Sequence, residues 1–376
     1  MKKHIGIFVL ILLSGCGDEI LNPSENLSIV PVMEIQMSQD NLNSLRVNRT
    51  NDAGYFVNIF YKGEKKKAEL EASGAGSRYN PRWSYKIELE NGETIEGLSA
   101  FNLSAQIYDP TMLNTAIALN YYEQVGLPVF HNSHVFLKIN NEDEALLVLL
   151  ERVEEEYFRK RNLPVFQLFK VGFGAKFSSE GGFYPQFHFE KKIPEDNSFY
   201  YLEQLINAID TSSNENLNSS LGKFIDIKNY IKYHAATSIL NNDDSFNNNF
   251  FLIKETKDSP FKIIPWDFDK CFSRVNDVKF AGENSIIKKI FKNPITFEWY
   301  KNELVYQLEN IYTEEKLFKV IDSTASVIRE AYNIDPYLGK ERYNFENEIE
   351  KLKNYISERR AYLRNNITNL SQNYFN

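Results

Sequence analysis

Cysteine is nearly absent from this chain of 376 residues, where it occurs twice, as Cys16 and Cys271. Because Cys16 lies in an N-terminal targeting segment, Cys271 has no second thiol with which to form an internal disulfide. The fold must therefore rest on a hydrophobic core, for which 43% hydrophobic and 14% aromatic residues are sufficient. No histidine stands near Cys271 in the sequence to activate it, so we expect it to pack as a small apolar group.

Several functional signatures are also missing. The net charge of −8 provides no basic excess of the kind that nucleic-acid phosphates require, which argues against nucleic acid as a partner. The five histidines lack metal-ligand spacing, and the H-E-x-x-H and G-x-S-x-G patterns do not occur. A zinc peptidase or an α/β-hydrolase is therefore not indicated.

Long hydrophobic runs are missing after the first sixteen residues, so the sequence predicts no membrane-spanning helix. Residues 1–15 combine a basic start with a short apolar run and small residues before Cys16, which is typical of a bacterial lipoprotein signal peptide. We expect lipidation of Cys16, a linker over residues 16–28, and an exported protein anchored to a membrane of the cell envelope. An ordinary secretory signal with a chance cysteine is the alternative.

The hydrophobic patterns divide the remaining chain in two. Residues 29–165 contain alternating segments typical of strands, with two or three helices between them. Residues 166–376 are mostly helical by period, with short strands at 250–253 and 261–264. We therefore predict an α+β fold with a strand-rich N-terminal lobe, a helix-rich C-terminal lobe and a cleft between them.

The most informative stretch of the chain runs from Asn242 to Asp269. Asp244 is followed five positions later by Asn249 and then, after two short apolar strands, by Asp267. Protein kinases use this order, with an Asp as catalytic base, an Asn five residues later on magnesium, and a further Asp on magnesium. The His and Arg that usually precede the first Asp are missing here.

Each of these residues also has a structural interpretation. Asn and Asp are common in the turn after a helix, and the neighbouring Asp243 could take the place of Asp244. Asp267 and Asp269 flank Phe268 at a strand end, where two carboxylates repel each other unless a cation is present. If the strand continued through them, both would lie on one face, and Asp269 would be a further metal ligand.

A nucleotide site also needs cationic groups. Lys86 lies on a predicted strand after the turn at residues 73–78, and Glu151 ends a fully apolar strand. In a kinase, a strand lysine contacts the phosphates and pairs with a glutamate, so we expect Lys86 and Glu151 to form that pair. A solvated surface lysine is the alternative for Lys86. The turn matches neither a Walker A loop nor G-x-G-x-x-G.

With these residues in view, the chain resembles the CotH kinase family, the atypical kinases similar to spore coat protein H. The likeness runs from about Val30 to about Leu363. The segments that carry it are Gly74 to Lys86, Leu103 to Gly126, Leu147 to Arg161, Phe169-Lys170, Asn242 to Phe250 and Ile264 to Asp269.

The resemblance implies a divergent two-lobed kinase-like fold that binds ATP and Mg²⁺. It implies Asp244 as the catalytic residue, Asn249 and Asp267 as metal ligands, and Lys86 with Glu151 as the pair on the nucleotide side. We also expect Asp269 to be a metal ligand and Arg78 and Lys170 to contribute to cofactor binding.

The chain departs from the family pattern at several positions. The main departures are Ser73 in place of Arg, Gly76 in place of Ser, Asn114 where a basic residue is frequent, Arg152 in place of Gln, and Asn248 in place of His. The change at position 73 removes a phosphate contact that the family pattern implies.

We therefore expect an exported kinase that transfers a phosphoryl group from ATP to a Ser or Thr hydroxyl of an envelope or coat protein. Two alternatives stay open. The fold could serve binding or assembly at the surface without catalysis, because ATP is scarce outside the cytoplasm. The acceptor could also be a glycan or a lipid.

Overall fold

The architecture was obtained as a computed structural model, which describes residues 29–48, 50, 52–74, 76–175, 177–179, 184–276, 284–339 and 342–375. The proposed signal peptide, the linker and Cys16 lie outside these residues. Within the described ranges, no helix has the length and apolar character needed to cross a membrane.

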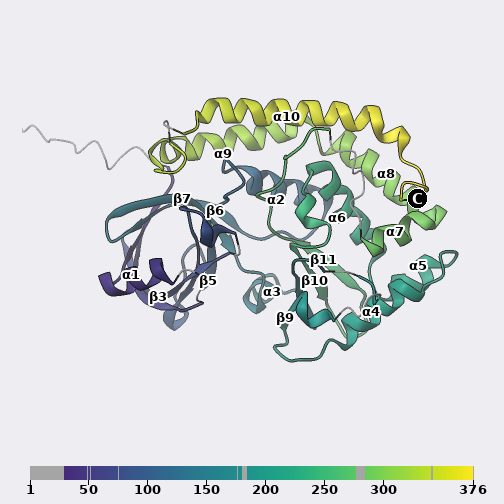
Figure 1. The fold of residues 1–376 in the computed structure, drawn as a ribbon, viewed down its shortest axis with the longest axis horizontal. Helices are drawn as coiled ribbons and strands as arrows, with labels where there is room; N and C mark the ends of the chain where they lie inside the picture. Colours follow the sequence, from purple (N-terminus) through teal and green to yellow (C-terminus); the bar gives the residue numbers. More distant parts are fainter. Residues whose placement is uncertain are drawn as a thin grey trace, which may run out of the picture.

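Strands of the N-terminal half close into a barrel, seen at the left of Figure 1. In order around the barrel they are β1 (Val32–Gln36), β2 (Tyr55–Tyr61), β3 (Glu64–Ser73), β4 (Ser84–Leu89), β5 (Ala100–Ser104), β7 (Glu142–Glu151) and β6 (Asn132–Ile139). Neighbours pair antiparallel except β1 and β6, whose parallel pairing closes the barrel. Asn140 and Asn141, with φ of 51° and 67°, form the tight turn between β6 and β7.

A second, four-stranded sheet lies in the C-terminal half. Its order is β11 (Phe261–Pro265), β10 (Phe250–Lys254), β8 (Gln167–Val171) and β9 (Phe189–Ile193), and every neighbouring pair is antiparallel. The strands at 250–253 and 261–264 were predicted from the sequence, whereas β5, β8 and β9 were not.

The helix α1 (Gln39–Val47) packs on the barrel, and the other helices lie between the barrel and the second sheet or around that sheet (Figure 1). The other helices are α2 (Asn114–Val125), α3 (Glu155–Arg161), α4 (Tyr200–Thr211), α5 (Leu217–Ser220), α6 (Ile227–Leu240), α7 (Ser285–Lys292), α8 (Pro294–Asn310), α9 (Glu314–Ile334) and α10 (Phe345–Asn366). Several ends follow the expected capping rules. Ser38 and Asp226 cap α1 and α6, and Gly126 ends α2 at φ 82°.

The molecule has two hydrophobic cores that share the wall formed by β6 and β7. One fills the barrel, and the other extends from the outer face of these strands through α2 to the C-terminal helices. Leu147 and Leu149 point into the barrel core, whereas Leu146, Val148 and Leu150 belong to the second core. Burial on both faces explains why the strand before Glu151 is apolar without alternation.

The helices α9 and α10 lie side by side and pass over both halves (Figure 1). At the end of α9, the Asp335 carboxylate accepts a hydrogen bond from the Leu146 amide of β7 at 2.6 Å. Further along α10, the buried Arg359 guanidinium donates to the Ser238 carbonyl of α6 at 3.0 Å. The predicted α+β plan, with a strand-rich front half and a helix-rich back half, is confirmed.

Candidate functional site

A cavity of about 410 Å³ lies where the barrel meets the second sheet. Lys86 of β4, Lys170 of β8 and Glu190 of β9 line it together with Asn249 and Asp267. The structure therefore brings together four residues that were predicted from separate parts of the sequence, and it adds Glu190. The cavity also has an apolar wall, whose members are Leu103, Phe130, Leu150, Val171, Phe173, Trp266 and Phe268.

Lys86 contributes a cation to this cavity from the barrel side. Its ammonium group lies 3.3 Å from the carboxylate of Glu71, which stands directly opposite on β3. The expected pair between Lys86 and Glu151 is wrong, because the register of β3 and β4 gives Lys86 a cross-strand partner instead. The side chain of Lys86 remains 44% exposed and so stays accessible to a ligand.

Glu151, at the end of β7, is bound by groups that do not line this cavity. Arg161 of α3 donates to both of its carboxylate oxygens, at 2.8 and 2.6 Å, and the His131 amide adds a third hydrogen bond at 2.8 Å. The Arg161 guanidinium also stacks 4.0 Å from the Tyr157 ring centre. This two-pronged ion pair, in which Glu151 is buried and Arg161 is partly exposed, satisfies Glu151, which does not line the cavity with Lys86 and Lys170.

Lys170 is the more deeply placed of the two cavity lysines. It stands directly opposite Glu190 in the β8–β9 pairing. Burial lowers the pKa of Lys170, and the negative charges of Glu190 and Asp267 oppose that change. Its ammonium also lies 5.9 Å from the centre of the Trp266 ring. Lys170 thus has the carboxylate of Glu190 opposite it and that of Asp267 in the same cavity. It is a cation that an anionic ligand can contact.

Asp244 follows α6 in a short 3₁₀ turn, and two side chains fix its carboxylate. The Asn249 amide nitrogen donates to its Oδ2 at 3.0 Å, and Lys270 Nζ donates to the same oxygen at 2.9 Å. Since the nitrogen of the Asn249 amide is used here, its oxygen points elsewhere. Asn249 adopts φ 57°, a left-handed conformation that Asn tolerates better than most residues.

Asp267 lies just beyond the end of β11 rather than within it. Its φ of 61° turns the chain out of the extended conformation, so the condition under which Asp267 and Asp269 would share a strand face is not met. The Asn242 amide donates to the Asp267 carbonyl at 3.0 Å and ties this turn to the loop after α6. Burial raises the pKa of the Asp267 carboxyl, and the negative charge of Asp244 adds to this effect.

Asp269 points away from the described cavity lining and toward the loop before α2. Burial, followed by the negative charges of Asp267 and Asp109, raises its pKa to about 8. Asn114, at the start of α2, donates to the carbonyls of Asp269 and Cys271 at 3.2 and 3.1 Å. Asn114, which departs from the family pattern, thus holds the acidic loop against α2.

Arg78 and the turn before it lie at the barrel end of the cavity. Ser73 and Gly74 line the cavity, whereas the Arg78 guanidinium bonds to the Asp52 carboxylate and to the Ala72 carbonyl, the latter at 3.0 Å. Arg78 is not part of the cavity lining. A role for Arg78 on a nucleotide therefore stays a prediction.

The oxygen atoms of this site suit a hard cation. Among the described residues, no three or more His, Cys, Asp or Glu side chains are grouped to hold a metal ion. The Asp267 carboxylate and the Asn249 amide oxygen, which line one cavity, match what Mg²⁺ uses when phosphate and water supply its remaining ligands. The negative charge of Asp244, which raises the pKa of the Asp267 carboxyl, further favours a cation there.

Glu71, Glu190 and Lys270 were not predicted from the sequence. Each is a charged residue in a segment rich in charge, and each gains its place through strand register or loop packing. Charge-rich surface segments are common, so no sequence signal distinguished these three residues from solvated ones.

The chain belongs to the CotH family, since the family model described as "CotH kinase protein" matches residues 70–363. It is therefore a kinase-like protein. The chain is also 24% identical over 361 residues to the inner spore coat protein H of Bacillus subtilis (strain 168), a match that spans 92% of this chain and 99% of that protein.

Solved kinase structures are similar over much of the chain. The Helicobacter pylori proinflammatory kinase CtkA matches with 12% identity and a TM-score of 0.34, over 85% of this chain and 91% of its own. The Golgi casein kinase matches with 11% identity and a TM-score of 0.30, over 90% of this chain and 74% of its own.

Proposed function

We propose that this protein transfers a phosphoryl group from ATP to the hydroxyl group of a Ser or Thr side chain in an exported protein, with Mg²⁺ as cofactor. One observation carries the proposal. Lys86, Lys170, Asn249 and Asp267 line a single cavity, and Asn249 is hydrogen-bonded to Asp244 beside it. These are the groups that phosphoryl transfer needs, because its catalysis rests on positioning and on charge stabilisation.

Each residue then has a defined task. Lys86 and Lys170 bind the phosphate oxygens of the nucleotide, and the apolar wall that includes Phe130 and Trp266 receives its base. Asn249 and Asp267 would hold Mg²⁺, which neutralises the charge of the phosphates. Asp244 orients the acceptor hydroxyl and accepts its proton, while hydrogen bonds from Asn249 and Lys270 keep its carboxylate in place.

We further propose that the protein is exported and held at a membrane of the cell envelope through lipid on Cys16. The support is the sequence of residues 1–16, with its basic start, its short apolar run and its small residues before the cysteine. Labelling cells with a palmitate analogue tests this part separately. A Cys16→Ala protein should take up no label and should leave the membrane fraction.

The enzymatic part is tested with Asp244→Asn and Asp267→Asn. Each should lower phosphoryl transfer by about 100-fold or more, because general-base and charge-stabilising groups contribute at least that much. Asp244→Asn should still bind MgATP. Asp267→Asn should bind MgATP more weakly than the wild type, and the size of this difference should depend on the Mg²⁺ concentration. Asp258→Asn, at an exposed turn between β10 and β11, is the matched control and should behave like the wild type.

Calorimetric titration with MgATP separates this function from a non-catalytic role. If the folded wild-type protein bound no nucleotide at millimolar concentration, the kinase proposal would be wrong. A surface protein that uses the fold for binding or coat assembly would then be the better interpretation. Transfer of label to envelope glycans or lipids, but not to proteins, would contradict the proposed acceptor.

A further inference from the structure

The loop from Asn242 to Asn249 borders more than the nucleotide cavity. A second cavity, of about 490 Å³, lies between α10, the loop before α2 and the loop after Asp267. Lys270 and Asp243 line this second cavity, and Lys270 Nζ is 2.9 Å from Asp244 Oδ2. Lys270 in the wall of the second cavity therefore bonds directly to the proposed base Asp244, as Asn249 in the lining of the first cavity does.

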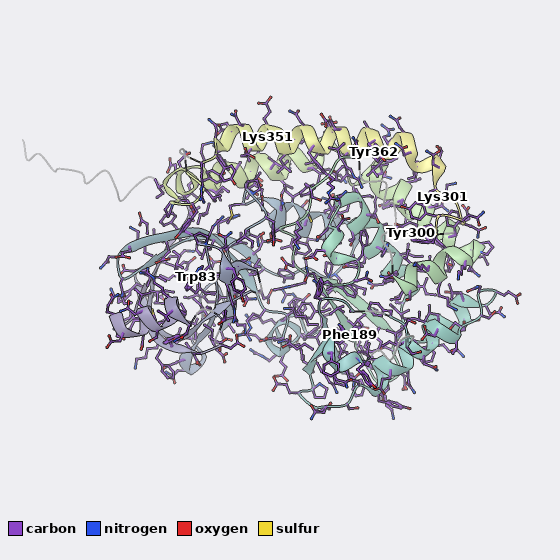
Figure 2. All side chains as sticks on the ribbon, viewed as in Figure 1. Trp83, Phe189, Tyr300, Lys301, Lys351 and Tyr362 are labelled. Carbon is purple, nitrogen blue, oxygen red and sulfur yellow. The ribbon has the colours of Figure 1, made fainter. Side chains whose placement is uncertain are left out.

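The lining of this second cavity is mainly apolar. Tyr108, Phe272, Leu352 and Tyr355 contribute rings and aliphatic surface. Two of the charged groups at its edge are satisfied within the chain. Lys351, labelled on α10 in Figure 2, forms an ion pair with Glu348 at 2.6 Å. Lys270 lies over the Tyr108 ring at 4.8 Å while it bonds to Asp244.

We propose that this cavity binds the acceptor polypeptide and selects a Ser or Thr that has a large apolar side chain next to it. The inference rests on the proposed function and deepens it by naming the acceptor class. The apolar neighbour would enter between Tyr108 and α10, and its hydroxyl-bearing residue would then face Asp244 across Lys270. The ring of Tyr108 is 57% exposed, so an incoming side chain can pack against it without unfolding the loop.

The proton and phosphoryl movements balance in this arrangement. The acceptor oxygen forms a bond to the γ-phosphorus as the bond between that phosphorus and the bridging oxygen of ATP breaks, and ADP leaves. The hydroxyl proton passes to Asp244. Lys270, which already bonds to Asp244, keeps that carboxylate in position to receive the proton.

A third cavity, of about 720 Å³, offers a competing acceptor site with different chemistry. It borders the same loop at Asn247, and Lys288, Lys289 and Lys292 of α7 line it against Asp210. It would favour an acidic acceptor. However, Lys289 already donates to the Ser212 carbonyl at 2.8 Å. Lys270, which bonds to Asp244, lines the apolar cavity instead.

Peptide binding without nucleotide tests the inference independently of catalysis. Two fluorescent serine peptides would be compared by anisotropy, one with Leu and Phe beside the serine and one with Asp at both positions. The apolar peptide should bind more tightly to the wild type. Tyr108→Ala should weaken its binding by about tenfold, as expected for loss of an aromatic contact, whereas Tyr108→Phe should not. Tyr306→Ala, at a residue with 54% exposure on α8, is the matched control.

Phosphorylation of the same peptides completes the test. Tyr108→Ala should raise KM for the apolar peptide and leave MgATP affinity within about twofold, since one aromatic contact to the peptide is lost and the nucleotide cavity is unchanged. Unchanged peptide binding in Tyr108→Ala would overturn the inference. So would a preference for the acidic peptide that Lys292→Glu removes. Failure of the wild type to bind MgATP, with peptide binding as expected, would instead overturn the proposed function and leave the docking site standing.

Discussion

Asp269 permits a direct test of the electrostatics of the acidic loop. Its pKa is raised to about 8 by burial and by the charges of Asp267 and Asp109, whereas an unfolded Asp titrates near 4. Below pH 4 the Asp269 carboxyl is protonated in both the folded and the unfolded protein, and the contribution of its raised pKa to the stability of the folded state is then fully present. As the pH rises toward 8, this contribution is lost. We therefore expect the protein without ligands to be more stable at pH 5 than at pH 8.

The size of the effect follows from the difference in pKa. About four pKa units correspond to an upper bound of about 5 kcal/mol between pH 4 and pH 8. Solvent reaches part of the Asp269 side chain and screens its charge, so we expect Asp269→Asn to stabilise the protein by about 2 kcal/mol at pH 8. At pH 5 most of this gain should be absent, because the wild-type carboxyl group is largely protonated there.

Urea unfolding at pH 5 and pH 8, followed by tryptophan fluorescence, measures the free energy of unfolding of the wild type and of Asp269→Asn at each pH. Trp266 lies in the same loop region and serves as a reporter. Asp258→Asn is the control, because it removes an exposed carboxylate far from the cavity. Adding Mg²⁺ should reduce the advantage of Asp269→Asn at pH 8, since a cation offsets the same repulsion. If Asp269→Asn changed the free energy of unfolding by the same amount at pH 5 and pH 8, the reasoning would be refuted.

The remaining predictions concern the charged partners of the site. Lys270→Met should lower phosphoryl transfer by about 10 to 100-fold with little change in MgATP affinity, and Lys270→Arg should recover part of the rate, because the bond to Asp244 can be retained. Glu190→Gln should weaken nucleotide binding measured by calorimetry, because the Glu190 carboxylate opposes the lowering of the Lys170 pKa by burial and so helps to keep that ammonium charged. Glu151→Gln should leave that affinity unchanged and destabilise the fold by about 1 to 2 kcal/mol in urea, because it weakens the charge-assisted hydrogen bonds from Arg161, whose side chain is partly exposed. Equal effects of the two glutamate variants on nucleotide affinity would contradict the assignment of Glu190.

The local parts of the site could be predicted from the sequence. The five-residue spacing from Asp244 to Asn249 fixes how far apart two side chains can lie in a short loop, and the two do form a hydrogen bond. The position of Asp267 after an apolar strand was also correct, and its backbone turns there instead of continuing the strand. The roles of these residues in catalysis stay predictions.

The parts that failed depend on contacts between distant segments. The partner of Lys86 is set by the register of β3 and β4, which hydrophobic alternation does not specify for charged residues on the outer face. Glu190 lies in a short strand with three consecutive charged residues, which has no strand periodicity to recognise. The closure of the barrel joins β1 to β6 across about a hundred residues, and no local pattern announces such a pairing.

The long helices α9 and α10 limit how the two halves can move. The Asp335 carboxylate, at the end of α9, bonds to β7 of the barrel, and Arg359 of α10 bonds to α6 of the C-terminal half, so this helix pair is bonded to both halves. A wide hinge opening between the halves would break these buried hydrogen bonds, each of which is costly to leave unmade. If the protein binds ATP as we propose, nucleotide exchange should depend on small movements of the loops at the cavity mouth more than on movement between the lobes.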